Sequence, residues 1–276
     1  MGPEAFCAAF IWILTKIGNQ AGRIVPFVWN RAQHHLHPRL WRANRVLKAR
    51  QPGFTTFFLI VRLFLNTILQ GGKGGLLVSQ NSQYATQHFV IVRRALRLFG
   101  AVDPYDNTQN GLCLSLRANL LHTQYANRRE LFFDWMDSKL LVESAEVEEA
   151  GQGITLHHVV CSEIARWPKI PENTVSNIKG ALVKGGTFDE ESTADGAAGY
   201  FYERFLASMN DALAADARPH FVPWYISEDY ELEMSEQEMQ EMLEDLTEDE
   251  LRLIKKMHKE LSSVAWGGNV ADVEVA

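Results

Sequence analysis

Short apolar runs alternate with longer segments in which apolar residues recur at helical spacing. A helix is predicted over Gly53–Gln70, and it contains the most apolar run of the chain, Phe54–Leu69. We interpret this run as a core helix and not as a membrane span, because Arg62 and Asn66 interrupt it and it is shorter than the ~20 residues that a span needs. Further helices are predicted over Gln83–Phe99 and around Asn119–Asn127. The predicted strands are Arg45–Lys48 (as a strand end), Gly75–Gln80, Leu112–Leu116, Ser138–Glu143, Thr155–Cys161 and Gly186–Glu191.

Strands and helices in alternation predict an α/β fold with a mainly parallel sheet flanked by helices. Near the start of the chain, Ala5–Leu14 predicts a buried amphipathic helix. A signal peptide is a poorer interpretation, because Glu4 precedes this segment and no cationic region does. After Trp224, acidic residues at helical spacing predict a C-terminal acidic helical segment.

The composition is that of a globular protein: 276 residues, 46% hydrophobic, are enough to bury a sizeable core. The three cysteines, Cys7, Cys113 and Cys161, are far apart and have no metal-ligand spacing. A disulfide framework and a zinc site are therefore not expected, and a reducing cytoplasm suits the chain best. We interpret all three cysteines as packing residues.

The net charge of −7 averages two regions of opposite sign. Between Met1 and Gly100, Glu4 is the only acid against thirteen Lys and Arg residues. Between Pro219 and Leu251 there are twelve acids and no Lys or Arg. The basic region favours a polyanionic partner, such as nucleotide phosphates or DNA.

The segment KARQPGFTTF has the outline of a phosphate-binding loop between a strand end and an apolar helix. Phe54 stands where such loops carry lysine, but Lys48 and Arg50 lie just upstream, and either can supply the charge. Thr55 is placed to reach Mg²⁺. A basic turn before a core helix is the alternative interpretation of this segment taken alone.

A second motif is the apolar run ITLHHVVCSEIARWP, which ends in an acid. P-loop ATPases present in this way the carboxylate that polarises the attacking water, and Glu163 occupies that place. Ser162 replaces the companion Asp that usually holds Mg²⁺. Downstream, Thr187–Gly196 is another strand, with the polar pair Ser192 and Thr193 placed to sense the γ-phosphate.

KARQPGFTT, LHHVVCSEIARWP and EESTADG, in this order and at these separations, resemble the ATPase motifs of the large terminase subunit, the DNA-packaging motor of tailed bacteriophages. Val25–Leu36 is similar to that family's adenine-recognition segment. The resemblance implies a P-loop NTPase fold with a displaced Walker A cation. The implied roles are catalysis for Glu163, Lys48 and Arg50; nucleotide binding for Gln33, Gln51, Gly53, Thr55 and Thr56; coupling for Ser192 and Thr193; and metal binding for Thr55 and Ser162.

The resemblance also implies ATP and Mg²⁺ as cofactors and double-stranded DNA, a portal protein and a small terminase subunit as partners. It implies a homo-oligomeric ring in the host cytoplasm. Residues 1–230 are then expected to form the ATPase domain, and residues 231–276 an acidic helical linker without the family's nuclease domain. Two functions follow: a motor that moves DNA into a procapsid, or a truncated remnant that binds nucleotide or DNA without productive hydrolysis.

Overall fold

The computed structural model describes residues 1–15, 22–50, 52–105, 123, 125–126, 129–210, 216–228, 235–244 and 246–262. Gln51, Cys113 and the strand predicted at Leu112–Leu116 lie outside these residues. The helix predicted around Asn119–Asn127 is described only in part. There the prediction is wrong, because Tyr125–Ala126 forms a strand paired with the next one along the chain.

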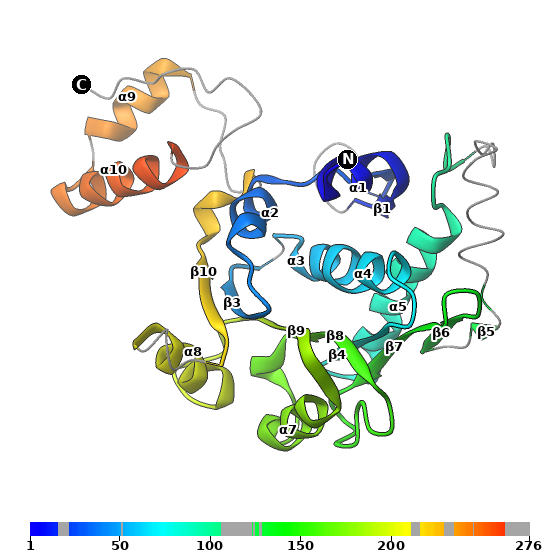
Figure 1. The fold of residues 1–276 in the computed structure, drawn as a ribbon. Coiled ribbons are helices and arrows are strands. Elements are labelled where there is room, and N and C mark those ends of the chain that lie inside the picture. The colour runs from blue at the N-terminus through cyan, green and yellow to red at the C-terminus, as the bar shows by residue number, and fades with distance from the viewer. Residues whose placement is uncertain are drawn as a thin grey trace.

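An eight-stranded sheet runs through the molecule in the order β10-β3-β9-β8-β4-β7-β6-β5 (Figure 1). Neighbouring strands from β10 to β7 are parallel, and β6 and β5 add an antiparallel edge. The prediction of a mainly parallel sheet is confirmed. The strands are β3 (Ala43–Lys48), β4 (Gly74–Ser79), β5 (Tyr125–Ala126), β6 (Glu130–Phe133), β7 (Ser138–Ser144), β8 (Leu156–Ser162), β9 (Leu182–Thr193) and β10 (Arg218–Val222).

Helices cover both faces of this sheet (Figure 1). One face carries α5 (Ser82–Arg97) and a continuous helix made of α3 (Phe54–Phe57), η3 (Phe58–Phe64) and α4 (Leu65–Ile68), of which η3 is π-helical. The other face carries α7 (Pro171–Ala181) and α8 (Tyr200–Asn210). The remaining elements are α1 (Pro3–Phe10), β1 (Trp12–Leu14), β2 (Ile24–Pro26), α2 (Arg31–Leu36), η2 (His37–Arg39), η4 (Ile164–Arg166), η5 (Trp224–Ile226), α9 (Glu236–Glu244) and α10 (Glu248–Ser262).

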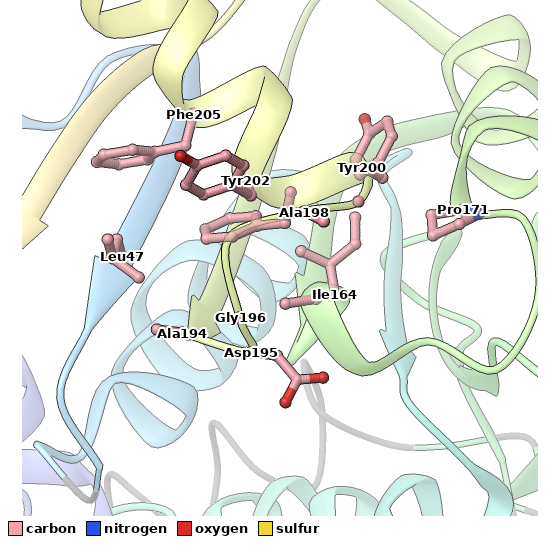
Figure 2. Close-up of a pocket in the computed structure, with 13 residues that line it drawn as sticks. Leu47, Ile164, Pro171, Ala194, Asp195, Gly196, Ala198, Tyr200, Tyr202 and Phe205 are labelled. Carbon is pink, nitrogen blue, oxygen red and sulfur yellow. The ribbon is translucent and has the colours of Figure 1, made fainter.

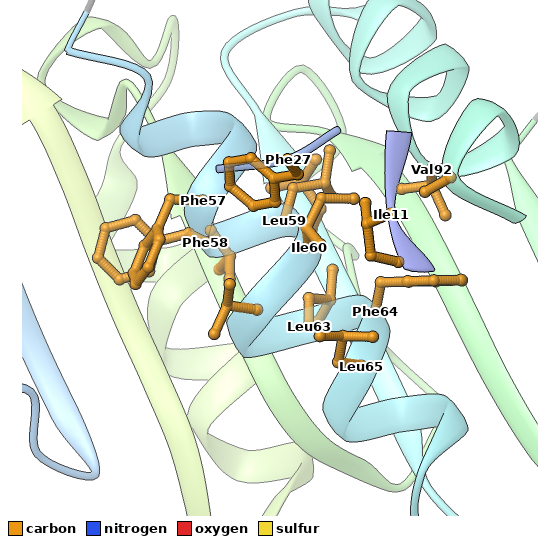
Figure 3. Packing of buried hydrophobic residues seen from close by; sticks show 14 of the residues in the cluster. Ile11, Phe27, Phe57, Phe58, Leu59, Ile60, Leu63, Phe64, Leu65 and Val92 are labelled. Atoms are coloured by element: carbon orange, nitrogen blue, oxygen red, sulfur yellow. The ribbon is translucent and has the colours of Figure 1, made fainter. Parts of the chain in front are cut away.

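The larger hydrophobic core lies around the helix that follows β3 (Figure 3). Apolar residues occupy nearly every position of η3, so this helix is buried on most of its circumference between the sheet and the N-terminal elements. Gly75 lets the helix approach the sheet closely, because a Cβ there would lie 2.5 Å from Thr67 Oγ1. A second core packs α7 and α8 against the opposite face.

Three consecutive buried carboxylates, Asp189–Glu191, occupy β9 in the middle of the sheet. Each has a basic partner: Arg62 Nε lies 2.8 Å from Asp189, Arg45 Nε lies 2.6 Å from Glu190, and Lys48 Nζ lies 3.1 Å from Glu191. Buried charges are tolerated when they are paired and hydrogen-bonded. Two of the three partners come from β3, so these pairs also bind β3 to β9.

Most of the predicted elements are confirmed, with small shifts at their ends. The predicted helix at Ala5–Leu14 is wrong beyond Phe10, where the chain turns into β1. Helical structure in the acidic segment is confirmed by α9 and α10. Within the described part of the chain, no helix is both long enough and apolar enough to cross a bilayer.

Candidate functional site

The phosphate-loop candidate lies between the end of β3 and the start of α3. Gly53 begins the helix in the left-handed conformation, with φ 71°, where glycine carries no steric penalty. A Cβ on Gly53 would lie 2.9 Å from Gln33 Nε2, so a larger residue would displace that amide. Thr55 and Thr56 follow in the first turn, each half-buried.

The predicted adenine-recognition segment holds this loop in place. Asn30 Nδ2 donates to Pro52 O at 3.1 Å, and Gln33 Nε2 donates to Gly53 O at 3.1 Å. Gln33 is also buried and completes a capping box with Asn30 at the start of α2. In this structure Gln33 therefore positions the loop, and adenine recognition by its amide stays a prediction.

Glu163 follows the last residue of β8, as predicted for a catalytic carboxylate at a strand end. Its backbone has φ 52° and ψ 43°, a conformation that non-glycine residues seldom adopt. Such strain persists where the surroundings fix the residue, and it is concentrated at functional sites. Here Thr193 fixes the side chain, because its backbone N and its Oγ1 donate to Glu163 Oε2 at 3.2 and 3.0 Å.

Lys48 connects the two ends of the site. Its Nζ donates to Glu163 Oε1 at 2.8 Å and lies 3.1 Å from Glu191 Oε2. Arg50, the other candidate cation, is exposed on the loop. The structure thus brings Lys48 into contact with the predicted catalytic carboxylate.

Charge pairing shifts the pKa values of both partners. Burial alone would lower the pKa of Lys48, but the neighbouring charges of Glu191 and Glu163 outweigh it, and the pKa is raised. Burial would likewise raise the pKa of Glu163, but the Lys48 charge and the hydrogen bonds from Lys48 and Thr193 lower it. Both groups are charged at neutral pH, as an ion pair requires.

Glu191 is a member of the site that the sequence analysis missed. Its Oε1 accepts hydrogen bonds from Thr55 Oγ1 at 2.8 Å and from Ser162 Oγ at 2.6 Å. It thereby joins the two residues predicted to bind metal. The sequence carried only a weak signal for it: Asp189 and Glu191 lie two residues apart on one face of β9, but their partners depend on the order of the strands.

The donors around Glu191 suit a hard cation. Carboxylate and hydroxyl oxygens are the protein ligands that Mg²⁺ uses beside nucleotide phosphates, and Thr55, Ser162 and Glu191 offer three of them. Among the described residues, no group of three or more His, Cys, Asp or Glu side chains is arranged as a metal site.

The coupling residues tie β9 to the turn after β8. Thr193 binds Glu163, as described, and Ser192 Oγ accepts from the backbone N of Ala165 at 3.2 Å. The end of β9 therefore holds Glu163, the predicted catalytic carboxylate, and the turn that follows it. A γ-phosphate sensor role for this pair stays a prediction.

A small pocket of about 70 Å³ opens beside this turn, on the α8 side of the sheet (Figure 2). Leu47, Ile164, Tyr202 and Phe205 line it with apolar surface, and Asp195 lies at one side. Its volume is well below the ~300 Å³ at which small-molecule sites begin. We therefore keep the cluster around Lys48, and not this pocket, as the candidate nucleotide site.

A mainly parallel sheet, a glycine-bearing loop between β3 and a helix, and a carboxylate at the end of β8, two strands away, are features of P-loop NTPase folds. No protein-family model matches the chain, and no curated protein matches it in sequence. Solved structures do match. The large terminase of bacteriophage HK97 has a TM-score of 0.59 and 14% identity, with 88% of this chain and 50% of that chain covered.

Two other phage proteins are similar over somewhat less of the chain. The large terminase ATPase domain of Thermus phage P74-26 has a TM-score of 0.48 and 18% identity, covering 71% of this chain and 81% of that one. The large terminase of another thermophilic bacteriophage has a TM-score of 0.47 and 11% identity, covering 77% and 48%. The likeness to the HK97 structure shows that this chain shares the fold of part of that large terminase, and the match spans half the length of that protein.

Proposed function

We propose that this chain is an ATP hydrolase, the ATPase motor domain of a phage or prophage large terminase, which drives double-stranded DNA into a procapsid. The observation that supports it best is the contact of Lys48, Glu163 and Glu191 at the carboxyl ends of β3, β8 and β9. In open α/β sheets this edge is where ligands bind. The likeness to the HK97 large terminase supports the same class of protein.

In the proposed reaction, the loop before α3 holds the ATP phosphates. Its backbone N–H groups and the helix N-terminus face the anion, and Lys48 supplies the cation that Phe54 cannot. Thr55, Ser162 and Glu191 would hold Mg²⁺ bound with ATP, and the metal would supply positive charge next to the phosphates. Glu163 accepts the proton of the attacking water, while Thr193 keeps its carboxylate in place.

Phosphate binding would also change the basicity of Glu163. The Lys48 ammonium now bonds Glu163 Oε1 and lowers the pKa of that carboxyl. A phosphate that takes over this ammonium removes the main charge that holds the pKa down. Glu163 then becomes a stronger base at the moment when substrate is present, and it is released to bind water.

The proposal extends to DNA through charge. The first hundred residues contain thirteen Lys and Arg residues and one acidic residue, which suits sequence-independent contact with the phosphate backbone of DNA. By the same proposal, the active form is a homo-oligomeric ring that works with a portal protein and a small terminase subunit.

The alternative is a terminase remnant that binds nucleotide without turning it over, and it rests on Phe54 and Ser162 replacing the usual lysine and aspartate. Steady-state phosphate release by the purified chain, with and without duplex DNA, separates the two. The motor is expected to hydrolyse ATP, and DNA is expected to accelerate it. Tight nucleotide binding with no turnover under either condition would favour the remnant.

A further inference from the structure

Glu191 occupies an unusual position for a carboxylate. It is fully buried in the central strand β9, which lies between β3 and β8. In the strand register it stands opposite Val46 on one side and Ser162 on the other. Its neighbours in the sheet are therefore the phosphate-loop strand and the strand that carries the catalytic glutamate.

The two oxygens of Glu191 have different surroundings. Oε1 accepts from both Thr55 and Ser162, as described above. Oε2 forms an ion pair with Lys48 Nζ at 3.1 Å and has no other partner among the described residues. A carboxylate oxygen has more than one acceptor site, so Oε2 can accept a further donor, such as a metal-bound water, beside the Lys48 ion pair.

Because residue 162 is a serine, β8 does not supply a carboxylate to this site, and one from another strand is needed. Ser162 stands at the strand position that usually carries the Mg²⁺-holding Asp, and its short hydroxyl cannot supply a negative charge. The side chain of Glu191 is one methylene longer than that of Asp. From the neighbouring strand, about 4.8 Å away, it reaches the Ser162 hydroxyl.

We propose that Glu191 replaces the missing Walker B aspartate, so that the carboxylate that orients Mg²⁺ with Thr55 is supplied by β9 instead of β8. This inference rests on the proposed ATPase function and assigns one residue within it. Glu191 is a positioning residue that acts on the metal through its bonds to Thr55 and Ser162. In this proposal the carboxylate has moved from the position of Ser162 on β8 to Glu191 on the adjacent strand β9.

A purely structural role makes a different prediction. If Glu191 were only a counter-ion for Lys48, neutralising it would lower the stability of the fold and the affinity of Lys48 for phosphate. Both losses would then be the same with and without Mg²⁺. If it orients the metal, the loss is confined to the Mg²⁺-dependent part of nucleotide affinity. The ratio of the two affinities therefore distinguishes the roles.

The experiment measures the Kd of a fluorescent, non-hydrolysable ATP analogue in excess Mg²⁺ and in EDTA. We expect Mg²⁺ to tighten binding to the wild-type chain, and Glu191→Gln to reduce that Mg²⁺ effect by ~10-fold or more, the usual size of an outer-sphere metal contact. Electron paramagnetic resonance of Mn²⁺ added with the analogue gives a second readout that is independent of turnover. The bound Mn²⁺ signal is expected to decrease in parallel.

A double variant supplies the rescue. Ser162→Asp combined with Glu191→Gln returns the carboxylate to β8, and the Mg²⁺ effect is expected to recover. Asp195→Asn is the matched control, because this half-exposed carboxylate lies near the turn but bonds neither Thr55 nor Ser162. If Glu191→Gln does not fold, Glu191→Asp keeps the charge beside Lys48 and shortens the reach, and it is expected to lose part of the Mg²⁺ effect.

The outcomes separate this inference from the function it rests on. A wild-type Mg²⁺ effect retained in both Glu191→Gln and Glu191→Asp would overturn the assignment and leave the proposed ATPase standing. A wild-type chain that binds no nucleotide in either buffer would overturn the proposed function itself.

Discussion

Lys48 Nζ donates to Glu163 Oε1 at 2.8 Å and so connects the last residue of β3 with the residue that follows β8. The two lie 115 positions apart in the chain, and only the order of strands in the sheet brings them together. Each shifts the pKa of the other toward the charged form. This pair is the centre of the proposed nucleotide site.

Replacing Lys48 tests the hypothesis that this residue supplies the phosphate-binding charge in place of the usual lysine. Lys48→Ala is expected to weaken ATP binding and to reduce turnover by ~10²-fold or more, because a charged hydrogen bond to phosphate contributes strongly. Arg50→Ala, on the exposed part of the loop, is expected to lose less. Both are measured on protein shown to be folded by circular dichroism. The opposite order of losses would assign the phosphate charge to Arg50.

Phe54 stands at the usual lysine position and is expected to act through packing alone. It is 1% exposed and contacts the rings of Phe57 and Phe58. Phe54→Ala should lower the free energy of unfolding by ~3–5 kcal/mol, the range for a buried phenylalanine. Urea denaturation measures this, with Val90→Ala on the exposed face of α5 as a control expected to change little. An unchanged unfolding midpoint in Phe54→Ala would contradict the packing role.

Local pattern is sufficient to predict part of the site. The apolar run that ends at Glu163 identifies β8 and its terminal carboxylate without reference to any other segment. The helix after Gly53 is predictable in the same way, because its apolar residues are contiguous. The order of these motifs also supports the class of fold.

The role of Glu191 in the site and the hydrogen bond from Gln33 to Gly53 were not predictable, because both depend on contacts between segments that are distant in the chain. In the sequence, Glu191 belongs to a run of acidic residues that resembles the polar end of a strand. Only the position of β9 between β3 and β8 shows that this run is buried next to Lys48 and Ser162. Gln33 bonds a loop residue twenty positions away. The strand β10 also escaped prediction, since Pro219 and the exposed Phe221 obscure the alternation of its buried side chains.

Acid sensitivity of the fold is expected from two buried histidines. Burial lowers the pKa of His158 and of His220 to about 4 in the folded chain, against 6.5 ordinarily. The unfolded chain therefore binds protons first as pH falls, and stability is lost between about pH 6.5 and 4, not above that range. Nearby charges on Arg218 and Arg39 act in the same direction on His220.

The measurement is the urea midpoint at pH 7 and at pH 5. His220→Gln keeps a donor for Asn44 Oδ1, which lies 3.0 Å from the His220 ring, and removes the titration. This variant is expected to lose less stability than the wild type between the two pH values. Equal losses in both proteins would show that His220 does not titrate in the way proposed.

Binding of duplex DNA is expected to be weak, independent of sequence and sensitive to salt. The motive is the basic excess in the first hundred residues, and affinity should fall by ~10-fold or more between 50 and 200 mM salt. Fluorescence anisotropy with two unrelated duplexes measures both properties. A strong preference for one duplex would count against backbone contacts as the main source of affinity. No cleavage of plasmid DNA with Mg²⁺ or Mn²⁺ is expected.

The acidic segment is expected to compete with DNA for the basic region. Deleting residues 228–250, which include twelve acidic residues and no Lys or Arg, should therefore strengthen DNA binding. Replacing Glu236 and Glu241 of α9 with Gln tests the effect of charge separately from the effect of removing the segment. Both residues are exposed, and the segment stays in place. If neither change strengthens binding, the segment does not act on DNA through charge.

The most direct test of the proposed ATPase is Glu163→Gln, measured on one preparation for both nucleotide affinity and phosphate release. The substitution removes the base but keeps an amide that Thr193 can hold, so the phosphate site should remain formed. The proposed mechanism predicts ATP binding at least as tight as in the wild type, together with a loss of turnover of ~10²-fold or more. Turnover equal to that of the wild type would contradict it.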